Sequence, residues 1–430
     1  MTWTRRSFLQ TTAAASAAFA APGIRGADKA KRYRTALIGT GWWGMNILKA
    51  AVAAGQSDVV GLCDVDRRFL DPAAEEIQKL TNQSPKKFGD YREMLEQQQP
   101  EIVIVATPDH WHPLNTIDAC NAGAHVFVEK PVGHTVMEGR AMVNAARAND
   151  RIVQVGTHRR VSPHNMWAMD FLHEGKLGPI GMLRSFVHSG GGPGSPTPDE
   201  EPPEGLDWDM WCGPAPLNPY NPAIHPRGFR HFLDYANGTL GDWGIHWMDQ
   251  IIWWSEEQWP KTVASTGAKW IRKDNADAPD TQVVQFGFDS FTAVWEHRRY
   301  AGNHAENHPY GIYFYGTQGT LHLGWLDGST FYPAARGREP THREPELHLP
   351  DHQNIPELWA DFLHCIRTGE RPVCDIEHGH RATTMSLLGM LAMKLGRTLE
   401  WDGENEQVVG DEEANRLLRR EYRAPWKYPI

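Results

Sequence analysis

Three glycines follow a short apolar run near the start of the chain in the order Gly-x-Gly-x-x-Gly. Thr35-Ala36-Leu37-Ile38 has the pattern of a strand, and the segment 42–54 has the periodicity of a helix. In that context the first glycine permits a tight turn, the second lets the backbone approach a pyrophosphate, and the third lets the helix pack on the strand. The motif therefore predicts a dinucleotide at a helix N-terminus, bound by Gly39, Gly41, Trp42, Trp43 and Gly44.

A carboxylate follows at the spacing expected of a ribose contact. Asp64 comes directly after a second predicted strand at 58–62 and lies twenty residues beyond Gly44. An acid at this place accepts hydrogen bonds from the adenosine ribose hydroxyls, and its charge repels a 2'-phosphate. The sequence thus favours NAD over NADP, although the nearby Arg67 would soften that preference.

A second pair of chemically capable side chains lies in the other half of the chain. The run from Gly241 to His246 opens a predicted helix that reaches about Trp254, which places Asp242 and His246 four residues apart on one face. This spacing lets a carboxylate orient an imidazole. The structural alternatives are an N-cap aspartate and a hydrogen-bonded core histidine.

Positioning these residues requires strands whose ends meet at one edge of a sheet. Helices and strands alternate through the first part of the chain, with helices expected at 71–81, near Tyr91, at 113–122 and at 135–149, and strands at 101–106, 125–128 and 152–155. The first of these helices is expected to open on Asp71, with Pro72 at the first helical position. Helical crossovers of this length predict a parallel sheet, so residues 31–155 are expected to form a doubly wound Rossmann domain.

Two further motifs lie at carboxyl ends of these parallel strands, where doubly wound sheets bind ligands. They are Ala106-Thr107-Pro108-Asp109-His110-Trp111-His112 and Glu129-Lys130-Pro131, whose lysine can anchor a substrate hydroxyl. Together with the glycine motif, they resemble the cofactor-side motifs of the Gfo/Idh/MocA family. The resemblance covers nearly the whole chain after the N-terminal segment.

That resemblance implies an NAD(P)-dependent oxidoreductase of sugars or cyclitols. It also implies that Lys130, Asp242 and His246 form the catalytic group, with the histidine as general base, as in members similar to inositol dehydrogenase. Other members carry a tyrosine at the position of His246, which leaves the sugar chemistry open. Further cofactor contacts are expected from Thr107, Pro108, His110, His112, Glu129 and Lys130.

The second half of the chain is expected to be an α/β domain, 156–430, with a large open, mostly antiparallel mixed sheet. Its strand-like runs are followed by two predicted helices, and a Gly/Pro-rich loop at 189–222 would be a substrate lid or a subunit contact. The resemblance implies a homo-oligomer formed through this domain. His158, Arg159 and Arg160 are predicted to bind a polar substrate, the alternative being exposed, solvated charges.

Composition excludes several classes of protein. A content of 40% hydrophobic and 22% charged residues is that of a globular chain, and a net charge of −10 without a basic run argues against nucleic-acid binding. Five scattered cysteines without a Cys-x-x-Cys indicate neither a disulfide framework nor a zinc cage. No membrane span is expected after the N-terminal segment, and no spacing among His225, His231, His297, His304 and His246 supports a metal, so none is predicted.

The N-terminus is typical of an export signal. Thr4-Arg5-Arg6-Ser7-Phe8-Leu9 is followed by an alanine-rich run at 11–21 with a small-x-small cleavage site at Ala18-Phe19-Ala20. This predicts a twin-arginine signal over residues 1–30 and a periplasmic or otherwise extracytoplasmic protein. Because that route carries folded proteins, NAD would be loaded before export and would have to remain tightly bound.

Three functions follow from these features. The favoured one is an NAD-dependent oxidoreductase that transfers hydride from a hydroxyl of a sugar, glycoside or cyclitol to a tightly bound nicotinamide. The first alternative is an NAD-dependent glycosidase that works by oxidation and elimination. The second is a non-catalytic sugar-binding protein that keeps its dinucleotide as a structural part, and the presence of Lys130, Asp242 and His246 together argues against it.

Overall fold

The computed structural model describes residues 31–302, 306–348 and 353–429. The predicted export signal and His304 lie outside the described residues.

The first sheet is a parallel Rossmann sheet, as predicted. Its six strands run in the order β3-β2-β1-β4-β5-β6, and each neighbouring pair is parallel. The change of direction in strand order lies between β1 and β4, which is where doubly wound sheets bind ligands. The strands are β1 (Tyr33–Ile38), β2 (Ser57–Cys63), β3 (Lys86–Phe88), β4 (Ile102–Val105), β5 (His125–Val128) and β6 (Val153–Val155).

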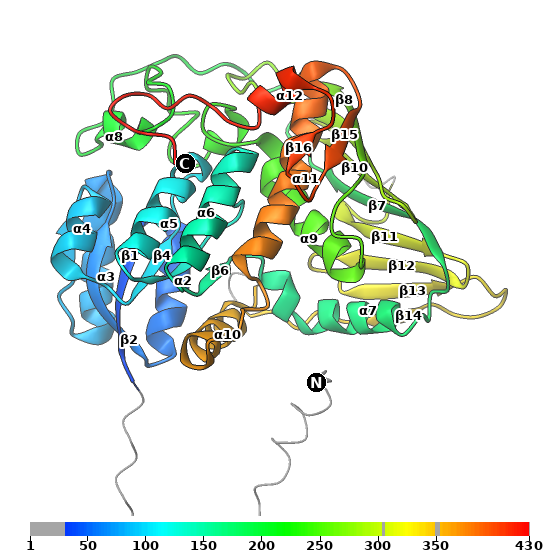
Figure 1. Ribbon diagram of the computed structural model, residues 1–430, viewed down its shortest axis with the longest axis horizontal. Helices are drawn as coiled ribbons and strands as arrows, with labels where there is room; N and C mark the ends of the chain where they lie inside the picture. Colours follow the sequence, from blue (N-terminus) through cyan, green and yellow to red (C-terminus); the bar gives the residue numbers. More distant parts are fainter. Residues whose placement is uncertain (1–30, 303–305, 349–352, 430) are drawn as a thin grey trace, which may run out of the picture. The chain divides into compact units, whose positions relative to one another are not determined.

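Helices cover both faces of this sheet, with a separate buried apolar cluster on each side (Figure 1). One of them begins earlier than the sequence analysis predicts. The Asp66 carboxylate accepts a hydrogen bond from the backbone N–H of Arg68 at 3.0 Å, so the helix begins at Arg67 and Pro72 lies inside it. The helices are α2 (Trp42–Ala53), α3 (Arg67–Thr81), α4 (Tyr91–Gln98), α5 (His112–Asn121) and α6 (Val136–Ala148).

The second sheet is large, mixed and mostly antiparallel, which confirms the predicted fold class. Its ten strands run in the order β14-β13-β12-β11-β7-β10-β9-β8-β15-β16, and β7 pairs parallel with β10 but antiparallel with β11. The strands are β7 (Ile180–His188), β8 (Thr262–Ala268), β9 (Thr281–Gly287), β10 (Thr292–Arg298), β11 (Tyr310–Gly316), β12 (Gly319–Gly324), β13 (Ser329–Pro333), β14 (Thr341–Arg343), β15 (Leu399–Asp402) and β16 (Gln407–Val408).

Three helices pack on one side of the large sheet and share its apolar core: α7 (Pro163–His173), α9 (Ile245–Trp254) and α11 (Ile376–Leu395). Helix α11 contacts α6 of the Rossmann domain as well as β8 of the large sheet. It therefore connects the two sheets directly. The Gly/Pro-rich segment contains one short helix, α8 (Trp208–Cys212), capped by the Asp207 side chain.

The C-terminal part of the chain returns to the Rossmann domain. Helix α10 (Ile355–Thr368) places Trp359 and Phe362 against Phe127 of β5, with ring centroids 5.9 and 6.1 Å away. Near the end of the chain, Trp426 packs edge-on against Trp111 at 4.8 Å. The nucleotide-binding domain thus takes part of its core from residues far beyond position 155.

Candidate active site

A cavity of about 810 Å³ is lined by residues of both domains. The Rossmann domain contributes the glycine motif and the ends of β2, β4 and β5, while the second half contributes residues 225–231, the π turn before α9 and Trp325. Most of the predicted site residues lie on its wall, namely Gly39, Gly41, Trp42, Trp43, Gly44, Asp64, Thr107, Pro108, Glu129, Lys130, His158, Asp242 and His246. From the Gly/Pro-rich segment, Met210 and Trp211 also line it.

The glycine motif has the geometry that a pyrophosphate requires. Gly39 has a φ of +91°, and a Cβ there would come within 2.6 Å of the Ala106 carbonyl oxygen. At Gly44 a Cβ would meet the Gly39 oxygen at 2.1 Å, whereas at Gly41 it would meet nothing within 4 Å. Close packing therefore requires glycine at positions 39 and 44, whereas Gly41 borders open space at the start of α2. These residues fit a dinucleotide phosphate.

Asp64 lies at the end of β2, on the wall of the same cavity. Its carboxylate accepts hydrogen bonds from the Thr40 backbone N–H at 2.7 Å, the Thr40 hydroxyl at 3.0 Å and the Asp66 backbone N–H at 2.9 Å. Burial raises the pKa of Asp64, while these hydrogen bonds oppose the shift. The carboxylate is thus held in one orientation beside the nucleotide loop, with lone pairs left for ribose hydroxyls.

This geometry gives a prediction about cofactor choice. We expect the chain to bind NAD at least about tenfold more tightly than NADP, equivalent to about 1.4 kcal/mol, because Asp64 repels a 2'-phosphate. The variant Asp64→Ala should narrow that ratio, as measured by fluorescence titration of nucleotide-free protein. Thr40→Val is the matched control, since it removes a hydrogen bond to Asp64 and leaves the charge in place. Equal affinity for the two nucleotides in the unmutated protein would contradict the assignment.

Two histidines predicted to bind the cofactor do not line the cavity. His110 contacts the carbonyl oxygens of Trp211 and Tyr235, at 2.9 and 3.3 Å. His112 contacts the carbonyl oxygens of Thr107 and Pro131, both at 2.8 Å. His112 thus links the loops after β4 and β5, and His110 links the loop after β4 to residues 211 and 235 of the second half, so both rings position the site.

Lys130 joins the two halves of the site. Its ammonium donates to the Asp242 carboxylate at 2.6 Å and to the Asp242 carbonyl oxygen at 2.7 Å, and the Arg230 guanidinium donates to the same carboxylate at 3.0 Å. Burial alone would raise the pKa of Asp242, but Lys130 and Arg230 outweigh it and hold that pKa well below its usual range. Asp242 is therefore a permanent anion that fixes the position of two cations.

The predicted orientation of His246 by Asp242 is wrong. Residues Leu240–Gly244 form a π turn, whose i→i+5 bonds widen the helix, and α9 begins only at Ile245. The four-residue spacing therefore does not bring the two side chains together, and the Asp242 carboxylate pairs with Lys130 and Arg230 instead.

His246 is buried on the cavity wall among aromatic rings. Its ring centroid lies 4.7 Å from that of Trp325 and 5.6 Å from that of His158. Burial, with smaller contributions from Lys130 and Arg159, lowers the pKa of His246 well below its usual value. The imidazole is therefore neutral at pH 7, which is the form that a general base requires.

Of the three residues predicted to bind substrate, only His158 lines the cavity. The Arg159 guanidinium stacks at 3.5 Å from the centroid of Trp325 and donates to the Trp325 carbonyl oxygen at 2.9 Å. Arg160 forms a buried ion pair with Asp249 at 2.8 Å. All three side chains are buried, so the alternative of solvated charges is wrong as well.

Sequence reasoning missed several residues of the wall, of which Arg230 and Trp325 lie against predicted catalytic residues. Arg230 lies in the segment Arg227-Gly-Phe-Arg-His231, twelve residues before Asp242, and its two arginines so near a candidate catalytic carboxylate could have indicated an ion pair. Trp325 follows β12 and is one of many tryptophans, so its type and position gave no signal. Arg230 is hydrogen-bonded to Asp242, and Trp325 packs against His246.

A Rossmann domain and a large mixed sheet enclosing lysine, histidine and carboxylate side chains define a nucleotide-dependent oxidoreductase. The chain belongs to the Gfo/Idh/MocA oxidoreductase family. Residues 33–157 match the family's "NAD-binding Rossmann fold", and residues 192–428 match its "C-terminal alpha/beta domain". The N-terminal domain is accordingly an NAD-binding domain.

Curated relatives match part of the chain. A glycosyl hydrolase family 109 protein of Stenotrophomonas maltophilia is 33% identical over 140 residues, covering 31% of each chain. An α-N-acetylgalactosaminidase of Shewanella oneidensis is 25% identical over 158 residues, covering 36% of this chain and 34% of that protein. The chain spans about a third of the length of the curated relatives it matches.

Among solved structures, levoglucosan dehydrogenase in complex with NADH and levoglucosan is similar, with a TM-score of 0.67 and 19% identity. The similarity covers 86% of this chain and 99% of that one, which establishes the shared fold. In the described part of the chain, no helix has both the length and the apolar character needed to span a membrane.

Proposed function

We propose that the protein oxidises a hydroxyl group of a sugar, glycoside or cyclitol by hydride transfer to a tightly bound nicotinamide. The observation that carries this proposal is the shared cavity: the glycine motif and Asp64 line the same cavity as Lys130 and His246. Nucleotide-binding and proton-transfer groups thus face one space. A non-catalytic protein would have no need of a half-buried ammonium and a neutral imidazole facing the same cavity.

Lys130 and His246 have different roles at the substrate hydroxyl. When bound, NAD would accept the hydride from the carbon that carries the hydroxyl. Lys130 uses two of its three N–H donors on Asp242, which leaves one for the substrate oxygen and stabilises negative charge developing on it. His246 accepts the hydroxyl proton, because its ring is neutral and lines the cavity.

The second candidate is a redox-neutral glycosidase. Oxidation at one carbon would acidify the neighbouring C–H, and loss of that proton would expel the glycosidic leaving group, which takes up a proton, and leave a double bond. Water would then add across this double bond, and return of the hydride to the carbonyl carbon would restore the oxidised cofactor. The two curated relatives above bear glycosidase names, and the cavity supplies a further titratable group. Burial raises the pKa of Asp109 to about 7, so this carboxyl can hold or release a proton near neutral pH.

One pair of measurements separates these candidates. Net oxidation produces absorbance of reduced nicotinamide when a polyol or free sugar is added, whereas redox-neutral cleavage releases the aglycone of a chromogenic glycoside without lasting absorbance. In D₂O, cleavage by elimination also places deuterium on the carbon next to the oxidised one. If pyranoside, N-acetylhexosaminide and cyclitol substrates give neither nicotinamide absorbance nor release of an aglycone, both candidate functions are refuted.

We also propose that the protein is exported by the twin-arginine route and works outside the cytoplasm. The support is the Arg5-Arg6 motif and the alanine-rich run that follows it. An extracytoplasmic compartment is not expected to maintain free NAD, so the cofactor must be carried with the folded protein and regenerated in place.

This gives a prediction about cofactor retention. Protein purified from the periplasmic fraction should carry about one NAD per chain after extensive dialysis, as measured by acid release and chromatography. It should complete many turnovers without added nucleotide, because the reduced nicotinamide would give its hydride either to a second substrate or back to the carbonyl of the cleaved sugar. Protein recovered empty, and active only with millimolar NAD, would show that the cofactor exchanges freely.

The outer side of the large sheet supports a proposal of homo-oligomerisation. Met182, Val283 and Tyr332 are each more than a third exposed, although Leu183 and Val284 beside them belong to the core. Apolar side chains on an open sheet are stabilised by covering them with a second copy. Light scattering of the purified chain measures its mass in solution and tests this.

A further inference from the structure

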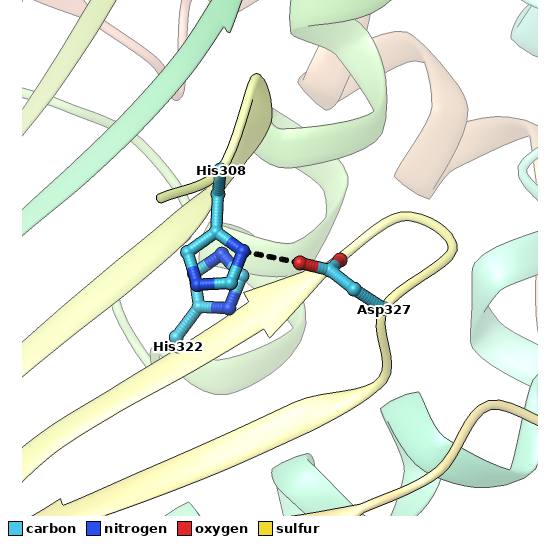
Figure 2. Close-up of side chains that lie close together, drawn as sticks. All are labelled: His308, His322 and Asp327. Atoms are coloured by element: carbon cyan, nitrogen blue, oxygen red, sulfur yellow. Dashed lines mark ion pairs between the residues drawn. The ribbon is translucent and has the colours of Figure 1, made fainter. Parts of the chain in front are cut away.

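A second cluster of ligating side chains lies on the large sheet, away from the cavity wall. His308 precedes β11, His322 lies in β12, and Asp327 lies in the turn between β12 and β13 (Figure 2). One nitrogen or oxygen of each side chain lies within 4.8 Å of the others. Figure 2 shows the two rings overlapping, with the Asp327 carboxylate beside them and ion-paired to Nδ1 of His308.

His322 lacks the hydrogen bonds that a buried imidazole needs. It has no exposed surface, and neither ring nitrogen has a hydrogen-bond partner. Its ring stacks on His308 with the centroids 3.7 Å apart and the planes inclined by 19°. Unpaired buried polar atoms destabilise a fold, so a ligand bound to this ring would stabilise it.

Two glycines leave the space that the cluster occupies. Gly311 and Gly324 lie directly opposite each other in the β11–β12 register. A Cβ at Gly311 would come within 2.4 Å of Nε2 of His322, and a Cβ at Gly324 within 1.7 Å of Oδ1 of Asp327. Neither glycine has a positive φ, so the backbone conformation does not require glycine there. The lack of a side chain at these two positions leaves room for the side chains of His322 and Asp327.

We propose that His308, His322 and Asp327 bind a divalent transition-metal ion, with Zn²⁺ as the best match. Two imidazoles and a carboxylate are a preferred ligand set for zinc, and three protein ligands leave a fourth position for water. The ion replaces the direct pairing of His308 with Asp327 and gives His322 the partner it lacks. A small cavity of about 230 Å³, lined in part by His308, Glu306 and Tyr313, lies beside the cluster.

The site has a structural consequence for the active site. Trp325 lies between His322 and Asp327 in the chain, and its ring packs 4.7 Å from His246. An ion bound to both flanking residues fixes the β12–β13 turn and with it this wall of the catalytic cavity. The proposed ion is therefore structural and takes no part in hydride or proton transfer. The sequence analysis predicted no metal because it compared only histidines that could gather around His246.

The experiment uses the full chain without a histidine tag. Metal is removed with a chelator, and ZnCl₂ is titrated calorimetrically and against a chromogenic competitor, while thermal unfolding is recorded with and without the ion. We expect one Zn²⁺ per chain, a rise in the unfolding temperature, and the visible absorption of tetrahedral Co²⁺ when CoCl₂ replaces zinc. Binding of well below one Zn²⁺ per chain, with no change in the unfolding temperature when the ion is added, would overturn the proposal.

Matched variants locate the site. His322→Gln and Asp327→Asn should each weaken Zn²⁺ binding by more than the roughly 10- to 100-fold typical of losing an outer-shell partner. His342→Gln is the control, because His342 lies nearby on β14 but is hydrogen-bonded to Thr330 at 2.8 Å and belongs to no ligand set. Circular dichroism verifies folding of each variant. Unchanged zinc affinity in both ligand variants would refute this site even if the chain binds zinc elsewhere.

Discussion

His246→Ala should lower the turnover of the preferred substrate by about 10²- to 10⁴-fold while the bound NAD remains at one per chain. That range is typical of a lost acid–base group. The ring lines the cavity, is neutral at pH 7, and is held between Trp325 and His158, so its removal deletes the proton acceptor without touching the glycine motif. Single-turnover measurement of nicotinamide reduction follows the step directly.

A second histidine serves as the control for that variant. His364→Ala removes an imidazole that is half exposed on α10 and paired with Glu370, outside the cavity, and it should leave turnover unchanged. Turnover of His246→Ala within twofold of the parent would remove His246 from the proposed mechanism. Loss of bound nucleotide in that variant would instead assign the ring to cofactor binding.

Lys130→Met should lower turnover by about 10²- to 10³-fold, the usual cost of losing one donor to a developing oxyanion. Methionine has a similar length but no charge, so the substrate oxygen loses its donor and Asp242 loses one of its cation partners while keeping Arg230. The loss should appear in kcat more than in KM, because the negative charge develops in the transition state.

Lys176→Met tests the same substitution at an exposed position, where the lysine pairs with Glu174 and neither residue lines the cavity. It should match the parent in rate and stability. An unchanged kcat for Lys130→Met, with only a higher KM, would limit Lys130 to holding the substrate in its ground state.

Local patterns predicted most of the architecture. The run His125–Val128 is a strand with the expected bounds, and the helix predicted at 135–149 is α6, closed at its start by a capping box between Thr135 and Glu138. The glycine motif was also readable, because strand, turn and helix follow each other within a few residues. Such features depend on neighbours in the chain, which the sequence displays.

Features that depend on contacts across the chain were predicted poorly. Because Leu240–Gly244 form a π turn, Asp242 pairs with Lys130 and not with His246. Hydrophobic periodicity does not indicate a π turn. His112 and Arg160 have residue types common in binding sites, yet His112 contacts two backbone carbonyl oxygens and Arg160 pairs with Asp249. Residue type and spacing therefore identified the candidates, and tertiary packing decided which of them reach the cavity.

The packing of α10 on β5 bears on how the chain is made. Phe127 leaves the ribosome long before its partner Trp359, and at 5–20 residues per second the interval is roughly 10 to 50 s. During that time the buried layer beneath β5 lacks the aromatic rings that cover it in the finished protein. The nucleotide-binding half is thus translated first but completed near the end of synthesis, when α10 arrives.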